Sequence, residues 1–563
     1  MQNQRVMIER TAARIALAGA LAVGCASEDP VAVAPDGSPD ASADAPPVRL
    51  VVLVVVDQLP AWSFERDRPA LSGGIDRLLD RGVYFAAGEY PHASTLTAPG
   101  HATLSTGTAP RQHGIIANQW YDGETDLVVD ATDDAAHPLL ALTPDAMTGP
   151  GRSSHRLLAP GIADALAAGT DGRGRTVTVS LKDRSAIFMA GQANALPLWL
   201  DSSQPAITTS DLYAASLPRW LVDLEGQHPL ATRLQEEWVP GDPALLAELT
   251  GNVDEGPGEG PSDGGLGTHF PHAPATAASP WGAFGATPAA NDLAFDVAEA
   301  AVIGEGLGAD ATPDFLGISL SAHDGAGHAW GQESWERLDL FLRLDRRLGA
   351  FLDFLDATVG PEGYAVVLTS DHGATPLVEQ SQLAGRPAWR IDRNEIVAAA
   401  ERGATQVLGP GPWAAAHEGN TVYMKRAFFD RTAAEQAAAL DAIVAEVQAL
   451  PGMGLVVPAD QLTGPCDAMA AAERPACETL APGRSGHVFA AATGDSLIAY
   501  SPTGTNHGAP TDWDRLVPVV VAAPGSSPRR EDDRTSMLRV APTLASLLGV
   551  SPPAMASEQP LDR

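Results

Sequence analysis

The sequence predicts an α/β fold in which a mostly parallel central sheet is sandwiched between helices. Continuous apolar, β-branched runs recur along the chain, and such runs are typical of strands buried on both faces. Helical patterns lie between these runs, and strands that alternate with helices indicate a parallel sheet with helices on both sides. With 563 residues, 45% of them hydrophobic, the chain can bury a large core.

Five runs are predicted as strands of this sheet. The first reads Leu-Val-Val-Leu-Val-Val-Val over residues 50–56, and the others cover residues 176–181, 315–320, 364–369 and 516–522. Apolar residues at helical spacing predict helices over 75–81, 335–355 and 537–548, and Gly549 is a stop signal after the last of them. In such sheets the functional groups lie beyond the carboxyl ends of the strands.

Two regions interrupt the alternation of strands and helices. Residues 189–300 are rich in tryptophan and include the Gly/Pro-rich acidic stretch 251–267, which predicts an insertion with a long surface loop. Residues 385–500 contain a strong helical pattern over 432–450 and a short strand candidate over 421–424. We expect a smaller α+β cap there, so the main domain covers residues 49–555 with two inserted cap regions.

The N-terminal residues are predicted to be a targeting segment. Three arginines precede the apolar run Ile15–Val23, and Gly24 and Cys25 follow it, which is the pattern of a secretory signal over residues 1–24. The position of Cys25 resembles a bacterial lipoprotein signal, in which that cysteine is lipidated, and an ordinary signal peptide is the alternative. Residues 25–48 are rich in Ala, Pro, Asp and Ser and indicate a flexible tether. We expect an exported protein that is periplasmic or held at the outer membrane or cell surface by a lipid anchor.

Charge and cysteine content exclude several classes of protein. The formal net charge is -34, from 36 basic and 70 acidic residues, which argues against a nucleic-acid partner. No apolar stretch approaches the roughly 20 residues of a membrane span. Only two of the basic residues are lysines, Lys182 and Lys425. Cys466 and Cys477 are predicted to form a local disulfide, because exported proteins fold in an oxidising compartment.

Three aspartates and three histidines lie close to the ends of the predicted strands. They are Asp57, after the first strand, then Asp324, His328, Asp371, His372 and, shortly before the last strand, His507. Strand ends at one edge of a sheet converge in space, so these six dispersed residues can build one site. Mixed nitrogen and oxygen ligands in two groups of about three suit a pair of Zn²⁺ ions.

A hydroxyl group is also predicted near a helix start. Residues 92–102 read His-Ala-Ser-Thr-Leu-Thr-Ala-Pro-Gly-His-Ala, where Pro99 can occupy the first turn of a helix and Thr97 lies just before it. A helix N-terminus favours an anion, whether an alkoxide or a bound phosphate. Thr97 could serve as a nucleophile, as an N-cap, or as both.

Two cations follow the predicted strand 176–181. Lys182 and Arg184 are two residues apart, and on a strand such residues point to the same face. A phosphate monoester dianion has an additional charged oxygen that a diester lacks, so paired cations favour the monoester.

Several motifs together resemble the alkaline phosphatase superfamily. They are Asp57-Gln, Thr-Ala-Pro-Gly-His at 97–101, His-Gly-Ile at 113–115 with Asn118 and Trp120, Asp-x-x-x-His at 324–328, Ser-Asp-His-Gly at 370–373 and Asn-His-Gly at 506–508. The order and spacing are most similar to the monomeric, phosphate-irrepressible alkaline phosphatases, which use Thr where other members use Ser. The resemblance covers roughly residues 49–555.

The resemblance implies the role of each site residue. One zinc would take Asp57, Asp371, His372 and the Thr97 oxygen, and the other would take Asp324, His328 and His507. Thr97 would form a phosphothreonine intermediate, while Asn118, Lys182 and Arg184 would bind the phosphate. We therefore expect a monomeric zinc phosphatase with two Zn²⁺ per chain and broad specificity for small phosphate monoesters.

Other functions remain open at this point. A phosphodiesterase or nucleotide pyrophosphatase on the same scaffold is the main alternative. A sulfatase is disfavoured, because position 97 is Thr and the Cys-x-Pro-x-Arg sequence is absent. A non-catalytic surface lipoprotein that binds phosphorylated ligands is a third hypothesis, and the complete set of ligand residues argues against it.

Overall fold

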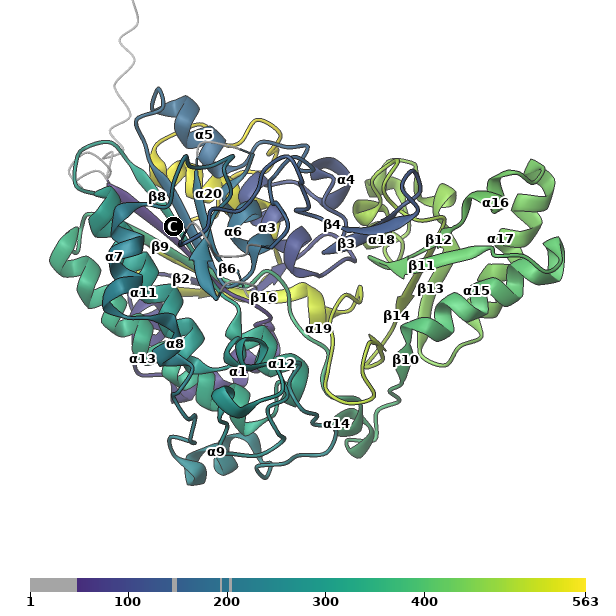
Figure 1. Cartoon of the computed structure of the whole chain (residues 1–563), viewed down its shortest axis with the longest axis horizontal. Coiled ribbons are helices and arrows are strands. Elements are labelled where there is room, and N and C mark those ends of the chain that lie inside the picture. Colours follow the sequence, from purple (N-terminus) through teal and green to yellow (C-terminus); the bar gives the residue numbers. More distant parts are fainter. Residues whose placement is uncertain (1–47, 144–148, 193–194, 202–204) are drawn as a thin grey trace, which may run out of the picture. The chain divides into compact units, whose positions relative to one another are not determined.

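A ten-stranded sheet organises the chain (Figure 1). The computed structural model describes residues 48–143, 149–192, 195–201 and 205–563. The strand order is β17-β2-β16-β9-β1-β8-β5-β6-β7, and the neighbours from β9 to β6 run parallel. The edge strand β17 covers Arg529–Glu531, and β18 (Thr535–Ser536) also lies beside β2. The predicted signal segment, Cys25 and nearly all of the predicted tether lie outside the described residues.

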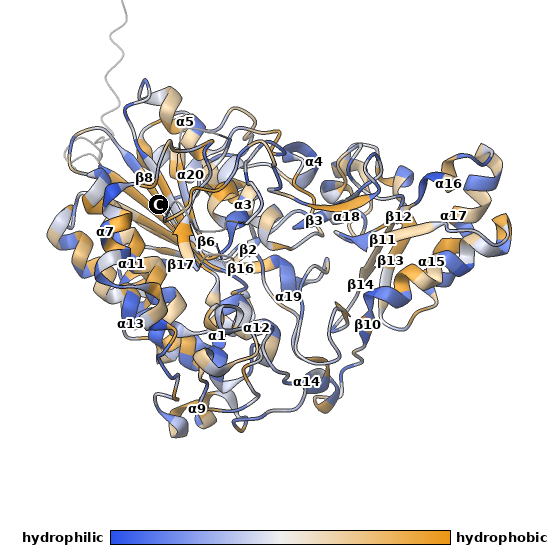
Figure 2. Ribbon diagram, in the orientation of Figure 1, coloured by the Kyte–Doolittle hydropathy of each residue, from blue (hydrophilic) through white to orange (hydrophobic). Residues whose placement is uncertain are grey.

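The central strand β1 (Leu50–Val56) has a neighbour on each side, β8 (Asp314–Leu320) and β9 (Tyr364–Thr369), and β5 (Thr176–Ser180) lies beyond β8. All seven side chains of β1 are buried, and burial of each contributes about 2 kcal/mol. The strands form an apolar centre between the helices (Figure 2). The predicted fold class, a mostly parallel sheet between helices, is therefore confirmed.

The side chains of β1 alternate between two hydrophobic cores. Leu50, Val52, Val54 and Val56 face one core and contact the helical layer formed by α2 (Gly74–Leu79), α11 (Pro288–Glu305) and α13 (Trp335–Thr358). The alternate valines and leucine face the other core, which includes α3 (Thr97–Thr106), α5 (Ile162–Gly169) and α20 (Val540–Leu548). This division follows from the two-residue repeat of a strand.

One strand of the central group runs the other way. β16 (Leu516–Ala522) is antiparallel to β9 and also to β2 (Val83–Glu89). The start of β16 therefore lies at the same edge of the sheet as the end of β9. The segment before β16 reaches the edge where the segments after β1, β8 and β9 emerge.

The predicted bounds of the insertion over residues 189–300 are too wide, because the central sheet and its covering helices extend into both ends of this range. β6 (Leu196–Asp201) pairs parallel with β5, and β7 (Ala206–Thr208) pairs antiparallel with β6, so the sheet continues into this region. At the other end α11 covers the sheet. Pairing with β5 lets the apolar residues of β6 become buried, which local composition does not reveal. Between these elements lie the short helices α7 (Arg219–Gln227), α8 (Leu230–Arg233), α9 (Pro243–Thr250) and α10 (Pro280–Phe284).

A smaller α+β region lies within residues 385–500. Four antiparallel strands form its sheet in the order β11 (Ala414–Glu418), β12 (Thr421–Met424), β14 (Val488–Ala492) and β13 (Met453–Pro458). Helices α15 (Arg393–Leu408) and α17 (Ala433–Gln448) share a hydrophobic core with this sheet. These elements are green in Figure 1. None of the described helices is long and apolar enough to cross a membrane.

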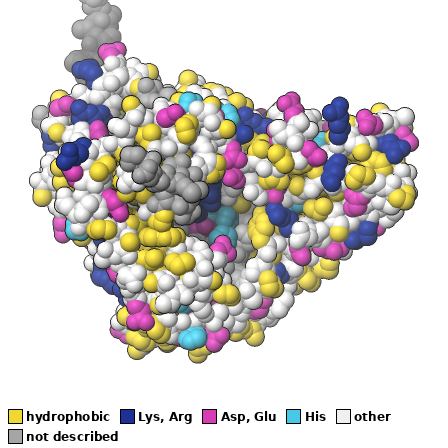
Figure 3. Space-filling view, in the orientation of Figure 1, with side chains coloured by type: hydrophobic (Ala, Val, Ile, Leu, Met, Phe, Trp, Pro, Cys, Tyr) yellow, Lys and Arg dark blue, Asp and Glu magenta, His cyan; other side chains and the backbone are white. Residues whose placement is uncertain are grey.

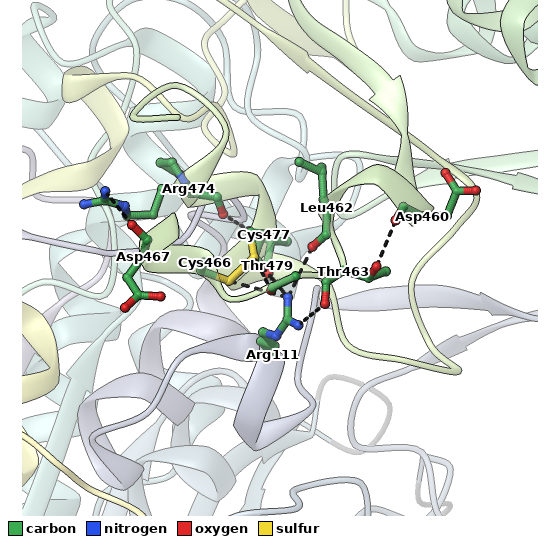
Figure 4. Close-up of a disulfide and its surroundings, with 11 residues drawn as sticks. Arg111, Asp460, Leu462, Thr463, Cys466, Asp467, Arg474, Cys477 and Thr479 are labelled. Atoms are coloured by element: carbon green, nitrogen blue, oxygen red, sulfur yellow. Dashed lines mark hydrogen bonds between the residues drawn. A yellow bond between two sulfur atoms is a disulfide. The ribbon is translucent and has the colours of Figure 1, made fainter. Parts of the chain in front are cut away.

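A disulfide joins Cys466 to Cys477 (Figure 4). The guanidinium of Arg111, from α4 (Pro110–His113), donates to the carbonyl oxygens of Cys477 at 3.3 Å and Thr463 at 2.9 Å. Cys477 lies in α18 (Arg474–Thr479), whose Thr479 hydroxyl oxygen accepts a hydrogen bond from the Ala93 amide at 2.8 Å. The disulfide segment thus supports the loop that leads to α3.

Candidate active site

Asp57, Asp371 and His372 form a completely buried triad, called here the first triad. His372 Nε2 lies 3.5 Å from Asp57 Oδ1 and 3.5 Å from Asp371 Oδ2. Each of these three atoms is buried without a hydrogen-bond partner among the described residues. One further side chain comes close, because His101 Nδ1 lies 3.2 Å from Asp371 Oδ2. Three buried polar atoms that face one point are what a bound cation requires.

Asp324, His328 and His507 form the second triad. Asp324 and His328 are four residues apart on α12 (Ala322–Trp330), which places them on one face of that helix. His507 comes from the segment before β16. Asp324 Oδ1 is 3.2 Å from His328 Nε2 and 3.5 Å from His507 Nε2, and the two nitrogens are 3.2 Å apart.

All three histidines of the triads bond to the backbone through the same ring nitrogen, Nδ1. The Nδ1 atoms of His372, His328 and His507 donate to the carbonyl oxygens of Gly373, Thr505 and Thr95, at 3.0, 3.1 and 2.7 Å. A carbonyl can only accept, so the proton is on Nδ1 and the lone pair on Nε2. In both triads Nε2 is the atom that faces the carboxylates, as metal ligation requires.

The spacing of the donor atoms also fits a metal. Tetrahedral zinc with bonds of about 2.1 Å to nitrogen and oxygen separates its ligand atoms by roughly 3.4 Å. In the two triads, the separations that involve a histidine nitrogen are 3.2 to 3.5 Å. The residues present in each triad therefore fit a divalent metal ion, and the two triads are candidate metal sites.

Lys182 lies between the two triads. Its Nζ donates at 2.6 Å to Asp57 Oδ2 in the first triad and at 2.6 Å to Asp324 Oδ2 in the second. Burial and the neighbouring Asp371 raise the pKa of Asp57 well above its usual range, although Lys182 opposes this. For Asp324, burial is outweighed by His328 and Lys182, which hold its pKa well below the usual range. Carboxylates packed this closely need cationic compensation.

The expectation that Lys182 and Arg184 share a strand face is wrong. β5 ends at Ser180, and α6 (Asp183–Ala190) begins directly after Lys182. Asp183 favours this helix start because its side chain accepts from the Arg184 amide at 2.7 Å. Lys182 and Arg184 nevertheless line the same cleft. A helix start brings them together there.

Thr97 is the first residue of α3 and is 1% exposed. The N-cap is Leu96, so the helix starts two residues earlier than the Pro99 pattern suggests. α3 packs tightly against the first triad: a Cβ on Gly100 would lie 2.2 Å from the Asp371 carbonyl oxygen. Near its start, the Ala98 amide donates to Asn118 Oδ1 at 2.8 Å.

Two histidines connect the Thr97 segment to the triads. His101 Nδ1 is 2.9 Å from the Thr97 carbonyl oxygen and also faces Asp371 of the first triad. On the other side, His507 of the second triad donates to the carbonyl oxygen of Thr95. The start of α3 is thereby held between the two triads.

A cleft of about 720 Å³ opens above the second triad. Its lining includes Asn118, Lys182, Arg184, Asp324, His328 and His507, together with residues that the sequence analysis does not identify: Arg152, Asp263, Glu418 and Tyr500. Figure 3 shows basic, acidic and histidine side chains gathered in a hollow of this face. Arg152, whose Nε lies 2.7 Å from Asp183 Oδ2, belongs to no motif, and only the folded structure brings it to the cleft.

Comparison with known proteins agrees with this fold and site. Alkaline phosphatase PafA of Elizabethkingia meningoseptica is 28% identical over 531 residues, which cover 92% of this chain and 94% of that protein. Alkaline phosphatase PhoK of Sphingomonas sp is 29% identical and covers 90% of each chain. A crystal structure of PafA matches with a TM-score of 0.84 and covers 92% of this chain and 99% of its own. A second PafA structure carries substitutions of a threonine, an asparagine, a lysine and an arginine.

The fold is that of the alkaline phosphatase superfamily. Within it, the family described as type I phosphodiesterase / nucleotide pyrophosphatase matches residues 51–445, which is more than half of the chain. The chain belongs to this family.

Proposed function

We propose that the protein is a zinc-dependent phosphate monoester hydrolase of broad specificity that acts through a phosphothreonine intermediate. The observation that carries this proposal is the arrangement around Lys182. Two triads with zinc-like ligand spacing flank this residue, which lines the cleft together with Arg184 and Asn118. The relatives PafA and PhoK are named alkaline phosphatases, which supports a phosphatase.

Each triad would hold one zinc ion, with the Thr97 oxygen as a further ligand at the first. A bound zinc pair would polarise the phosphate oxygens and lower the pKa of the Thr97 hydroxyl and of the attacking water. Thr97 would attack the phosphorus in line with the leaving oxygen, and hydrolysis of the phosphothreonine would then release inorganic phosphate. The N-terminus of α3 stabilises negative charge at Thr97.

Lys182, Arg184 and Asn118 would bind the non-bridging oxygens of the transferred phosphate. A monoester dianion offers one more charged oxygen to these groups than a diester does, and charge-assisted hydrogen bonds are the strong ones. The Asn118 Oδ1 atom accepts from the start of α3, which directs its Nδ2 group away from that helix as a donor. The four residue types substituted in the PafA variant are those of Thr97, Asn118, Lys182 and Arg184.

A phosphodiesterase is the second candidate, because the matching family is described by that activity. The two candidates differ in the expected preference between substrates. Initial rates with matched aryl phosphate, bis-aryl phosphate and aryl sulfate esters, measured before and after chelation, separate them. We expect the monoester to react fastest, chelation to abolish turnover, and zinc to restore it. A higher kcat/KM for the diester would overturn the monoesterase assignment.

The remaining parts of the proposal concern where and how the protein acts. We propose a monomer that is exported to the periplasm or the cell surface, with Cys25 lipidated as its sole membrane anchor. The disulfide between Cys466 and Cys477 suits an oxidising compartment. Small phosphate monoesters are the proposed partners, and the net charge of -34 disfavours nucleic acid.

A further inference from the structure

We propose that Gln58 is a positioning residue that connects the two triads from inside the protein and sets the metal affinity of the second triad. The inference rests on the proposed function, since it requires that the triads hold metal ions. Gln58 directly follows Asp57 at the end of β1 and is completely buried. Resemblance and motif alone assign it no role.

Gln58 makes one hydrogen bond to each triad, through different parts of the residue. Its backbone amide donates at 3.2 Å to Asp371 Oδ1, and its side-chain Nε2 donates at 2.8 Å to Asp324 Oδ1. The second bond is to the oxygen that faces His328 and His507. Hydrogen bonds to a ligating carboxylate fix its orientation and raise metal affinity. Removal of the side chain therefore acts on the second triad alone.

The backbone of Gln58 is strained, which indicates that the side chain is needed. Its φ is +63°, in the left-handed region. The other non-glycine residues with positive φ in the described part of the chain are Asp126, Asp171 and Asn420, and such short polar residues tolerate this region more readily. A residue with a long side chain keeps this strained backbone conformation only where contacts with the surrounding structure hold it there.

Gln332 holds the side-chain amide of Gln58 in place, and Gly327 leaves space for it. Gln332 Nε2 donates to the Gln58 carbonyl oxygen at 3.1 Å and to Oε1 at 3.0 Å. This leaves Nε2 of Gln58 as the group that faces Asp324. Gly327, on α12 between the two ligands Asp324 and His328, makes room for the amide, since a Cβ there would lie 1.8 Å from Gln58 Oε1.

Gln58 and Lys182 bond to different oxygens of the Asp324 carboxylate, Oδ1 and Oδ2. Lys182 has an 18% exposed side chain, lines the cleft, and is the residue that would turn to bind phosphate. Gln58 has no access to the cleft and carries no charge. It can hold Asp324 in the same place at every stage of the reaction, which Lys182 cannot do.

The first test is a zinc titration of metal-free wild type and Gln58→Gly, with the two binding steps resolved by competition with a chromophoric chelator. Glycine tolerates positive φ and keeps the backbone bond to Asp371, so the variant should fold. We expect zinc to bind the second triad 10–100-fold more weakly, as is usual when a partner of a metal ligand is lost. The first binding step should change less than about twofold, well below that range. Asp171→Gly, at another left-handed residue far from the triads, is the matched control and should match wild type.

Gly327→Ala provides an independent test because it displaces the Gln58 amide without removing it. We expect the same selective loss of zinc at the second triad. In the double variant with Gln58→Gly there is no Gln58 side chain to displace, so Gly327→Ala should cause a smaller additional loss of zinc affinity. Unchanged affinities in Gln58→Gly, or equal losses at both triads, would overturn the inference. Wild type that binds no zinc would instead overturn the proposed function.

Discussion

The imidazole rings of His372 and His507 stack, with centroids 3.7 Å apart and 18° between their planes. One ring belongs to the first triad and the other to the second, although 135 positions separate the two residues in the chain. Because of this stack, each ring packs against a ligand of the other triad. His328, also in the second triad, has its ring centroid 5.0 Å from that of His507. Among the described residues, no ring contact joins His328 to His372.

This stacking predicts coupling between the two metal sites. His507→Ala is expected to lower zinc affinity at the second triad and, by freeing the His372 ring, to weaken the first triad about tenfold as well. His328→Ala removes one imidazole from the same triad without touching His372, so the first triad should be unaffected. Zinc titration of both variants measures the difference, and identical profiles would contradict the coupling.

Thr97 is predicted to be the nucleophile. Thr97→Val keeps the shape of the side chain and removes the hydroxyl, so kcat should fall by about 10³-fold or more. Thr97→Ser retains an attacking oxygen and should keep substantial activity. Acid quenching with radiolabelled substrate should trap labelled wild-type protein and unlabelled Thr97→Val. Labelling of the valine variant would exclude Thr97 as the site of phosphorylation.

Lys182 and Arg184 are predicted to select monoesters. Replacing both with alanine removes two charge-assisted hydrogen bonds, so kcat/KM for an aryl phosphate should fall by about 100-fold or more. The loss for a bis-aryl phosphate should be far smaller. Lys425→Ala, at the other lysine of the chain, is the control and should leave both rates unchanged. If both substrates lose equally, the cations do not discriminate between them.

A buried carboxyl group is predicted to make stability depend on pH. Burial raises the pKa of Glu336 from 4.5 to about 8. Its Oε1 atom lies 3.0 Å from His272 Nε2. The unfolded chain releases this proton near pH 4.5, so the stabilising contribution is complete below that pH and is lost as the pH rises to about 8.

Glu336→Gln keeps this side chain neutral at every pH. Its melting temperature should equal that of wild type at pH 5 and exceed it by a few degrees at pH 9. Glu124→Gln, at an exposed glutamate, should follow wild type throughout. A constant difference between Glu336→Gln and wild type across this range would contradict the assignment.

The disulfide is predicted to stabilise the fold. Replacing Cys466 and Cys477 with serine opens a loop of 11-residue separation, which costs about 3 kcal/mol in the chain-entropy model. The midpoint of urea unfolding should fall accordingly. A reductant should shift wild type toward the double variant and leave the variant itself unchanged. A variant that unfolds at the wild-type midpoint would show that the bond contributes nothing.

The elements predicted best from the sequence are those that local pattern determines. The run Leu50–Val56 is continuous and apolar because it is buried on both faces, so its composition alone reports its place in the sheet. β6 is not predicted because it contains Pro197 and a polar sequence follows it, and only pairing with β5 makes it a strand. The local structure at Lys182 was missed for a similar reason, since a helix starts where the strand pattern runs out.

In the candidate site, the residues that belong to motifs can be predicted from the sequence. Residues whose role depends on their position in the folded chain cannot. The six triad residues lie in the two groups that the resemblance implies. Gln58 was visible in the motif, but neither its positive φ nor its two bonds can be read from a pattern. Arg152 and Tyr500 are 348 positions apart in the chain, and only the folded structure brings them to the same cleft.

The position of β1 between β8 and β9 has a consequence for the order of assembly. Asp57 is made early, but its neighbours in the triads are made much later, and His507 is near the end of the chain. The first triad needs the chain as far as His372 and the second needs it as far as His507, and pairings between distant segments form slowly. A partly made or unfolded chain therefore has no centre at which to collect metal. On the proposed function, metal would bind only after the chain has folded, so the protein would be inactive until then.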